Sequence, residues 1–240
     1  MGRIPSLTLQ TFQSCNASSI VEAWRWLLAA AEANPALISS VSSFRYDLVD
    51  VGRQVLMDLF PQMYSPLVSA CSGNHSRGSG SWGGTPCALA MLNTSGPMIL
   101  ELATDFDRLL RTETHFGNRL AEWIASARAF GGTDSAEQDW LEWNARMQVT
   151  LWGSPAPALY DYASKQWSGL VAGYHVPQWR HFLQRMGRAA ASSSENPYAA
   201  VQAEIVEMAE AWVASTQPVE GVSGESPLEV GKALFSKYCK

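Results

Sequence analysis

The side chains that could do chemistry are scattered along this sequence of 240 residues and form no known catalytic pattern. None of the four histidines has the spacing typical of metal ligands, and His175 and His181, six residues apart, point to different helix faces. No serine occurs in a G-x-S-x-G pattern beside a base. We therefore expect no metal site and no cofactor.

Two pairs of neighbouring carboxylates, Asp47 with Asp50 and Asp105 with Asp107, are the remaining candidates for acid–base chemistry. Both pairs lie in segments with helical periodicity, where a solvated face or an ion pair within the helix is the better interpretation. We assign no catalytic residue.

A long uncharged stretch is the most informative part of the sequence. No charged residue occurs from Met147 to Tyr160, and Arg146 and Asp161 bracket the gap. Its middle, 153–157, contains two prolines and cannot be helix interior. Two helices must therefore flank a loop, with Trp152 before it and Tyr162 after it. These rings either fill a core or meet a ligand.

The same stretch resembles the C-terminal helical region of the α-N-acetylglucosaminidases, lysosomal-type glycoside hydrolases that trim N-acetylglucosamine from heparan sulfate. The motifs that carry the resemblance are EAWR (22–25), FRYDLVDVGRQ (44–54), NAR-x-Q-x-TLWG (144–153), DYA-x-KQWSGLV (161–171), Tyr174, Pro177 and WR (179–180). They occur in this order over most of the chain.

The resemblance implies roles for particular residues. Trp152 and Tyr162 would line the sugar pocket, and Leu159 would add an apolar contact. Arg146, whose helix neighbours are apolar and aromatic, and Asp161 would anchor the loop. The carboxylates of the resembled family lie on a barrel domain that precedes the helical region. A barrel needs roughly 250 residues and a strand pattern that this sequence does not have, so the expected partners are that preceding catalytic barrel and a carbohydrate substrate.

Composition narrows the partners and the compartment. The net charge is −5 and no Lys/Arg block occurs, which argues against nucleic acid and anionic membranes as partners. No apolar run of about 18 residues suggests a membrane span, and the N-terminus has no apolar core typical of a signal peptide. With the resemblance, the sequons at Asn16, Asn74 and Asn93 indicate a lysosomal or secretory protein of which this chain is a fragment.

Periodicity and caps predict an all-α fold, an array or bundle of eight or nine helices. Residues 1–17 are expected to form a connecting segment and 18–240 the helical domain. A Gly/Ser-rich loop over 72–86 is flanked by Cys71 and Cys87, which could pair in an oxidising compartment. The expected helices cover about 18–34, 44 to Pro61 or beyond, 97–112, 116–130, 134–152, 161–174, 177–190, 197–215 and 225–238, with a broken helix over 86–93.

A second hypothesis fits the same pattern. The chain could be a non-catalytic helical module, for protein interaction or carbohydrate contact, without an enzyme domain. An upstream coding region for a barrel with paired glutamates would favour the enzyme, whereas a native start at Met1 would favour the module.

Overall fold

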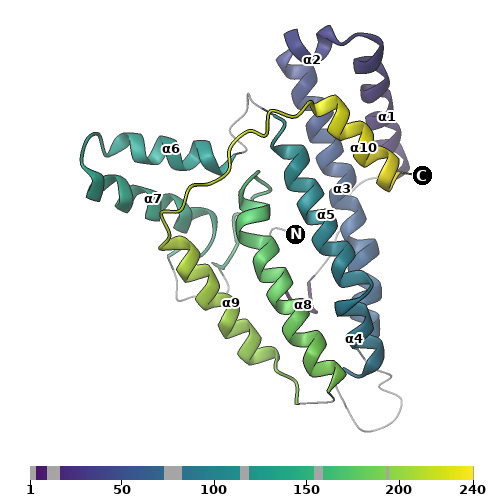
Figure 1. The fold of residues 1–240 in the computed structure, drawn as a ribbon, viewed down its shortest axis with the longest axis vertical. Helices are drawn as coiled ribbons and strands as arrows, with labels where there is room; N and C mark the ends of the chain where they lie inside the picture. The colour runs from purple at the N-terminus through teal and green to yellow at the C-terminus, as the bar shows by residue number, and fades with distance from the viewer. Residues whose placement is uncertain are drawn as a thin grey trace.

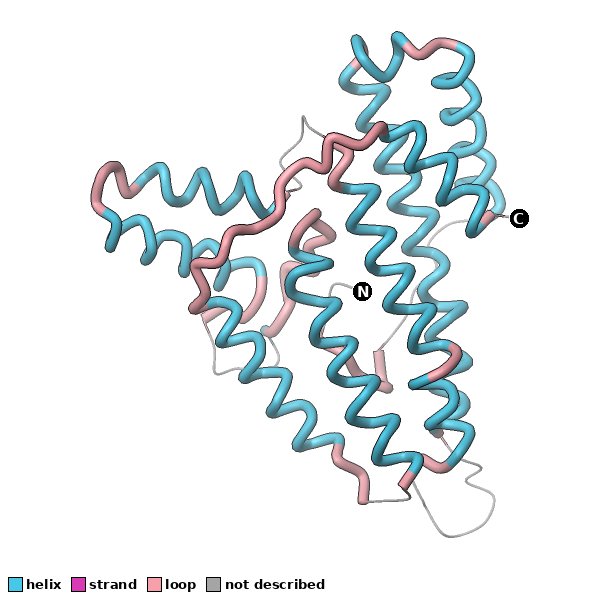
Figure 2. Tube along the Cα trace, viewed as in Figure 1, coloured by secondary structure: helices cyan, strands magenta, loops and turns pink. Residues whose placement is uncertain are grey.

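The computed structural model describes residues 4–9, 17–72, 83–113, 119–153, 159–192 and 195–239. These residues form an all-α fold, and none of them belongs to a β-strand, as Figure 2 shows. Nine of the described α-helices have eight or more residues, as predicted. The helices are α1 (Ala17–Ala33), α2 (Ala36–Ser40), α3 (Ser42–Cys71), α4 (Thr85–Leu92), α5 (Ser95–Leu110), α6 (Leu120–Phe130), α7 (Ser135–Val149), the π-helical turn η2 (Val171–His175), α8 (Val176–Ala191), α9 (Tyr198–Val213) and α10 (Pro227–Tyr238).

The main core lies where α3, α5, α4 and α8 pack against one another, and α1 and α10 close its upper end (Figure 1). Trp24 of α1 is completely buried there. A Cβ atom added at Gly52 of α3 would lie 2.6 Å from the indole of Trp24. Gly52 is therefore required by the close approach of α1 and α3, which explains one glycine of the 44–54 motif.

Helix α3 continues through both of its prolines, Pro61 and Pro66. From the sequence it was open whether Pro61 ends this helix or only kinks it, and the structure shows that the helix does not end there. A proline inside a helix costs about 3 kcal/mol. Burial on both sides of Pro61 offsets that cost, because Phe60 stacks on Tyr64 with ring centroids 5.4 Å apart and both rings pack on Trp179 of α8.

A second, smaller core joins the α6–α7 hairpin to α9 and η2. The hairpin projects to one side of the long helices (Figure 1). Asp134 caps α7, because its carboxylate accepts the backbone N–H groups of Ala136 and Glu137. This second core carries the loop that follows α7.

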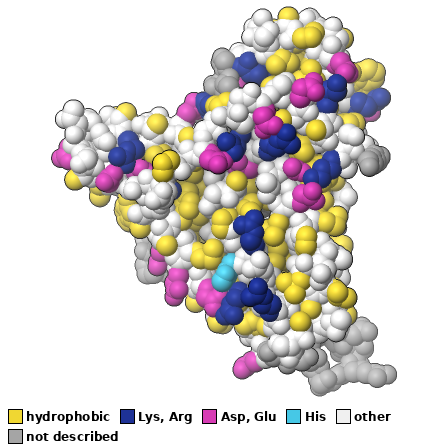
Figure 3. Space-filling model, in the orientation of Figure 1, with side chains coloured by type: hydrophobic (Ala, Val, Ile, Leu, Met, Phe, Trp, Pro, Cys, Tyr) yellow, Lys and Arg dark blue, Asp and Glu magenta, His cyan; other side chains and the backbone are white. Residues whose placement is uncertain are grey.

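The segment 214–226 crosses the face of the molecule between α9 and α10 (Figure 1). Arg108 of α5 holds it through Glu225, and Arg111 holds it through Glu220 and the carbonyl oxygen of Gly221. Dark blue and magenta side chains accordingly lie next to one another over α5 and α10 in Figure 3, whereas hydrophobic side chains gather between α8 and α9.

Three helix predictions need correction. The helix expected over 161–174 is replaced by η2, which begins only at Val171, because Asp161, Ser164 and Gly169 have φ values of 54°, 46° and 79°, which a right-handed helix cannot contain. Helix α2 was not predicted, since five residues with no buried side chain leave no periodic signal. Helix α6 begins at Leu120, and residues 116–118 of the expected helix lie outside the described residues.

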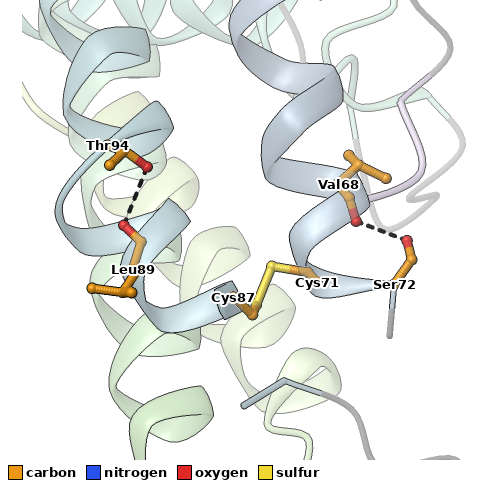
Figure 4. The surroundings of a disulfide bond; sticks show 6 residues. All are labelled: Val68, Cys71, Ser72, Cys87, Leu89 and Thr94. Atoms are coloured by element: carbon orange, nitrogen blue, oxygen red, sulfur yellow. Dashed lines mark hydrogen bonds between the residues drawn. A yellow bond between two sulfur atoms is a disulfide. The ribbon is translucent and has the colours of Figure 1, made fainter. Parts of the chain in front are cut away.

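Cys71 and Cys87 form a disulfide that joins the end of α3 to the start of α4 (Figure 4). Their Cα atoms are 4.4 Å apart and both residues are buried in the main core. The pairing left open by the sequence is thus present in the structure. Cys239 is free and partly buried.

Candidate functional site

Three apolar side chains of the predicted sugar-contact set are exposed at the loop that follows α7. The exposed fractions are 46% for Trp152, 42% for Leu159 and 64% for Tyr162. The rings of Trp152 and Tyr162 meet edge to face, with centroids 5.8 Å apart and an interplanar angle of 82°. The structure therefore brings Trp152 and Tyr162 together as one aromatic corner at the surface, and neither ring belongs to the core.

The end of α7 determines where the indole of Trp152 lies. Trp152 has a φ of 53° and Gly153 a φ of 78°, so two consecutive residues are in the left-handed region. The backbone N–H of Trp152 donates to the carbonyl oxygen of Met147 at 2.9 Å, which closes the last turn. A left-handed residue at a helix end is usually glycine or asparagine, and a tryptophan there is strained. This reversal of the chain leaves the ring outside the second core.

The two sides of the loop are joined below the aromatic corner. The backbone N–H of Asp161 donates to the carbonyl oxygen of Thr150 at 2.8 Å, and the hydroxyl of Thr150 donates to the carbonyl oxygen of Arg146 at 2.7 Å. Thr150 and Asp161 are both buried. The Asp161 carboxylate neighbours the phenol of Tyr174, and burial first and this carboxylate second raise the pKa of Tyr174. Asp161 thus lies behind the exposed corner and not on it.

Arg146 is almost completely buried, at 1% exposure. Its Nε donates to Glu142 at 2.8 Å, and its Nη2 donates to the carbonyl oxygen of Gln217 at 2.9 Å. The guanidinium also lies 4.6 Å from the ring centroid of Trp212 on α9. Arg146 therefore connects α7 with α9 and with the segment 214–226 directly beneath the loop.

Asp107 has a structural role that the sequence analysis missed. We predicted a solvated face or an ion pair within the helix, but the carboxylate is buried and accepts the backbone N–H groups of Gly169 at 2.8 Å and Ala172 at 3.0 Å. It therefore caps the segment that leads into η2, and burial raises its pKa to about 6. In the other pair, Asp47 with Asp50, the carboxylate of Asp50 forms the expected ion pair within the helix, with Arg53 three residues further along α3.

An exposed aromatic stripe on α7 was also missed. Trp140 and Trp143 are exposed and lie three residues apart, on the same side of α7. Met147, one turn further along, is partly buried and packs against the second core. The high tryptophan content was the only sequence signal for it, because a core and a surface patch give the same count.

Two of the hollows among the described residues lie next to Arg146 and next to the segment that follows Tyr162. One, of about 650 Å³, is bounded by Arg146, Trp212, Gly173 and the segment 215–220. The other, of about 460 Å³, lies between α3 and residues 163–167. In the described ranges no group of three or more His, Cys, Asp or Glu side chains could hold a metal ion, and no described helix is long and apolar enough to cross a membrane.

The predicted glycosylation sites are only partly visible. Asn93 is exposed at the end of α4. Asn16 and Asn74 lie outside the described residues. Of the predicted site residues, Trp152, Leu159 and Tyr162 are at the surface, whereas Arg146 and Asp161 are buried beneath them.

Comparison with known proteins identifies relatives of the chain in sequence and in fold. The chain is 33% identical to the human (Homo sapiens) α-N-acetylglucosaminidase over 236 residues, which is 98% of this chain but 29% of that protein. Its fold matches a family 89 glycoside hydrolase from Clostridium perfringens in complex with PUGNAc, with a TM-score of 0.73, 22% identity, and coverage of 99% of this chain and 26% of the other. A double variant of the C. perfringens enzyme in complex with its substrate GlcNAc-α-1,4-galactose matches with the same TM-score and coverage at 21% identity.

The chain thus spans less than a third of the length of these relatives. The family model described as the α-N-acetylglucosaminidase C-terminal domain matches residues 1–237. On these grounds the chain belongs to the family of the C-terminal domain of α-N-acetylglucosaminidases.

Proposed function

We propose that this chain forms one wall of the sugar pocket in a larger α-N-acetylglucosaminidase, which removes terminal α-linked N-acetylglucosamine from glycosaminoglycan of the heparan sulfate type. The observation that carries the proposal is the exposed aromatic corner of Trp152 and Tyr162, which buried residues hold from below. An indole face suits the apolar C–H face of a pyranose, and a phenol adds a polar tip. Leu159 extends the apolar surface.

In this role the chain binds and orients the sugar but does not protonate the leaving group. Asp161, the carboxylate nearest to the corner in sequence, is buried behind it. The acid and the nucleophile of a retaining mechanism must be two carboxyl groups about 5–5.5 Å apart that face the glycosidic bond. We assign both to a catalytic barrel that precedes this chain in the parent protein.

The proposed partner is therefore that barrel, and the α7 stripe supports an interface next to the sugar pocket. Trp140 and Trp143 are large aromatic side chains exposed on one helix face. Aromatic residues of this kind are enriched where proteins dock. An interface at Trp140 and Trp143 would position the wall of the sugar pocket against the barrel.

The proposal extends to a lysosomal or secretory location. The disulfide between Cys71 and Cys87 fits an oxidising compartment. Asn16 is the sequon that we expect to carry a glycan in a secretory cell, with Asn93 as a second site exposed in the structure. Mass spectrometry of secreted material that found Asn16 unmodified would contradict this part.

Activity assays on two proteins test the function. The purified chain should not hydrolyse a chromogenic α-N-acetylglucosaminide above a boiled control, whereas the parent protein with its preceding domain should do so. Turnover by the chain alone would refute the assignment of the catalytic carboxylates. An inactive parent protein would favour the alternative, a helical module for interaction or carbohydrate contact.

A further inference from the structure

The hollow between α3 and residues 163–167 contains a set of polar groups that the proposed sugar wall does not use. It has a volume of about 460 Å³ and is bounded by Asp50 and Arg53 of α3 and by Lys165, Gln166 and Trp167. Tyr162 of the aromatic corner is only three residues from Lys165, so their Cα atoms are at most about 11 Å apart. This is a span of the order of a disaccharide.

Arg53 is held in place yet keeps unused donors. Its Nε donates to Asp50 at 2.7 Å and its Nη1 donates to the side-chain oxygen of Gln166. A guanidinium has five N–H donors. The remaining three have no partner among the described residues, and the side chain is 23% exposed beside the hollow. Arg53 can therefore bind a planar anion without losing the bonds that orient it.

Lys165 supplies a second cation at the same place. Its ammonium lies 5.2 Å from the ring centroid of Trp167, which restricts where the charge can be. Within the described part of the chain Lys165 forms no ion pair with a carboxylate. Of the charged groups that bound the hollow, two are cations and one, Asp50, is an anion. The hollow therefore has a net charge of about +1, which a single bound carboxylate or sulfate would neutralise.

The rest of the lining suits a sugar. Asp50 uses one oxygen for Arg53, and its other oxygen makes no bond among the described residues. It can accept a bond from a hydroxyl group. An amide from Gln166 and a half-buried indole from Trp167 complete a polar surface with one apolar side.

We propose that this hollow is a second carbohydrate subsite, specific for an acidic sugar that carries a carboxylate or a sulfate. Arg53 and Lys165 bind the anionic group, and Asp50 accepts bonds from hydroxyl groups. The subsite holds a unit next to the sugar at Trp152 and Tyr162. This inference rests on the proposed function, because it assigns the aromatic corner to the neighbouring sugar.

Binding of three small probes to the isotope-labelled chain tests the subsite by NMR. The probes are methyl β-glucuronide, N-acetylglucosamine 6-sulfate and the neutral methyl β-glucoside. We expect one or both acidic probes to shift the indole N–H signal of Trp167 and to bind at least tenfold more tightly than the neutral probe. The two acidic arms distinguish a carboxylate from a sulfate. Equal binding of all three probes, or no binding of either acidic probe, would overturn the proposal.

Variants make the test specific. Lys165→Gln should weaken the acidic probe on the order of tenfold, as expected for loss of a charge-assisted hydrogen bond. Lys232→Gln is the matched control, because Lys232 is an exposed lysine on α10 paired with Glu32 and should leave binding unchanged. Unchanged binding to Lys165→Gln would contradict the subsite. Trp152→Ala should leave binding of methyl β-glucuronide unchanged, because that probe lacks the N-acetylglucosamine unit assigned to Trp152. Failure of the subsite and failure of the proposed sugar pocket can therefore be told apart.

Discussion

The indole of Trp152 and the phenol of Tyr162 meet edge to face, with centroids 5.8 Å apart, on opposite sides of one loop. Directly below the two rings, the backbone N–H of Asp161 donates to the carbonyl oxygen of Thr150, and both of these residues are buried. An aromatic pair of this geometry contributes about 0.5–1.5 kcal/mol beyond its buried area. The corner is therefore ordered before any ligand binds, which reduces the entropy lost on binding.

The first prediction concerns the disulfide. Cys71 and Cys87 are 16 residues apart, and closing a loop of this length stabilises the fold by about 3 kcal/mol in the chain-entropy account. The double variant Cys71→Ser with Cys87→Ser should lower Tm by roughly 6–12 °C. Cys239→Ser serves as the control, because Cys239 is a free thiol, and should change Tm little. Equal Tm values for all three proteins in oxidising buffer would contradict the role of the bond.

The second prediction concerns Arg146. Replacing it by Met leaves the buried carboxylate of Glu142 with Arg128, at 2.7 Å, as its one remaining cationic partner among the described residues. Removal of one member of a buried ion pair costs about 3–5 kcal/mol. We expect Arg146→Met to lower the free energy of unfolding by that order, as measured by urea denaturation.

A double variant checks the mechanism. Arg146→Met combined with Glu142→Gln also removes the buried charge that has lost one of its two partners, and should recover part of the lost stability. If the losses of unfolding free energy of the two single variants simply add, the ion pair does not explain the stabilisation by Arg146. The packing of Arg146 on Trp212 would then account for the loss.

The third prediction concerns pH. His175 is buried in η2, and burial lowers its pKa to about 3, below its ordinary value of about 6.5. Between these values the unfolded chain binds a proton that the folded chain does not bind. The stability linked to His175 is thus present above about pH 6.5 and is lost as the pH falls, on the order of 2 kcal/mol at pH 5. His175→Phe should therefore lose less stability than the unmodified chain between pH 7 and pH 5 in thermal unfolding.

Titration of Asp107 changes the stability with pH in the opposite direction to His175, so it is tested with a separate variant. Its pKa is raised to about 6 in the folded state, so the folded chain binds the extra proton, and the linked stability is lost as the pH rises through 6. Asp107→Asn keeps an oxygen acceptor for Gly169 and Ala172 and should remove this loss. If His175→Phe and the unmodified chain follow the same pH dependence, the account of His175 is wrong.

Local sequence rules predicted most of the helices because their evidence is local. The cap at Asp134, the proline in the first turn of α5 and the glycines after α6 each act within a few residues. The segment 161–169 was predicted wrongly for the opposite reason. Its backbone is determined by contacts distant in sequence, above all the cap from Asp107 and the bridge between Arg119 and Ser168.

The sequence predicted the residue types of the candidate site but not which of its side chains are buried and which are exposed. The absence of charge between Arg146 and Asp161 indicated that the stretch is either buried or in contact with a ligand. In the structure adjacent residues differ in this respect, since Leu151 is buried and Trp152 is exposed. A left-handed tryptophan decides this division, and no propensity predicts it. The hollow beside Arg53 has residues from α3 and from 163–167, so no single stretch of sequence contains it.

The most direct test of the sugar wall is the variant Trp152→Ala in the parent protein with its catalytic domain. Exposed Trp152 contributes little to the core, so Tm should change little, whereas kcat/KM for an α-N-acetylglucosaminide should fall by the equivalent of about 1–3 kcal/mol. Trp26→Ala is the matched control, because Trp26 is an exposed tryptophan on α1, and it should keep kcat/KM. A severe loss of Tm with unchanged kcat/KM in the surviving folded enzyme would contradict the account.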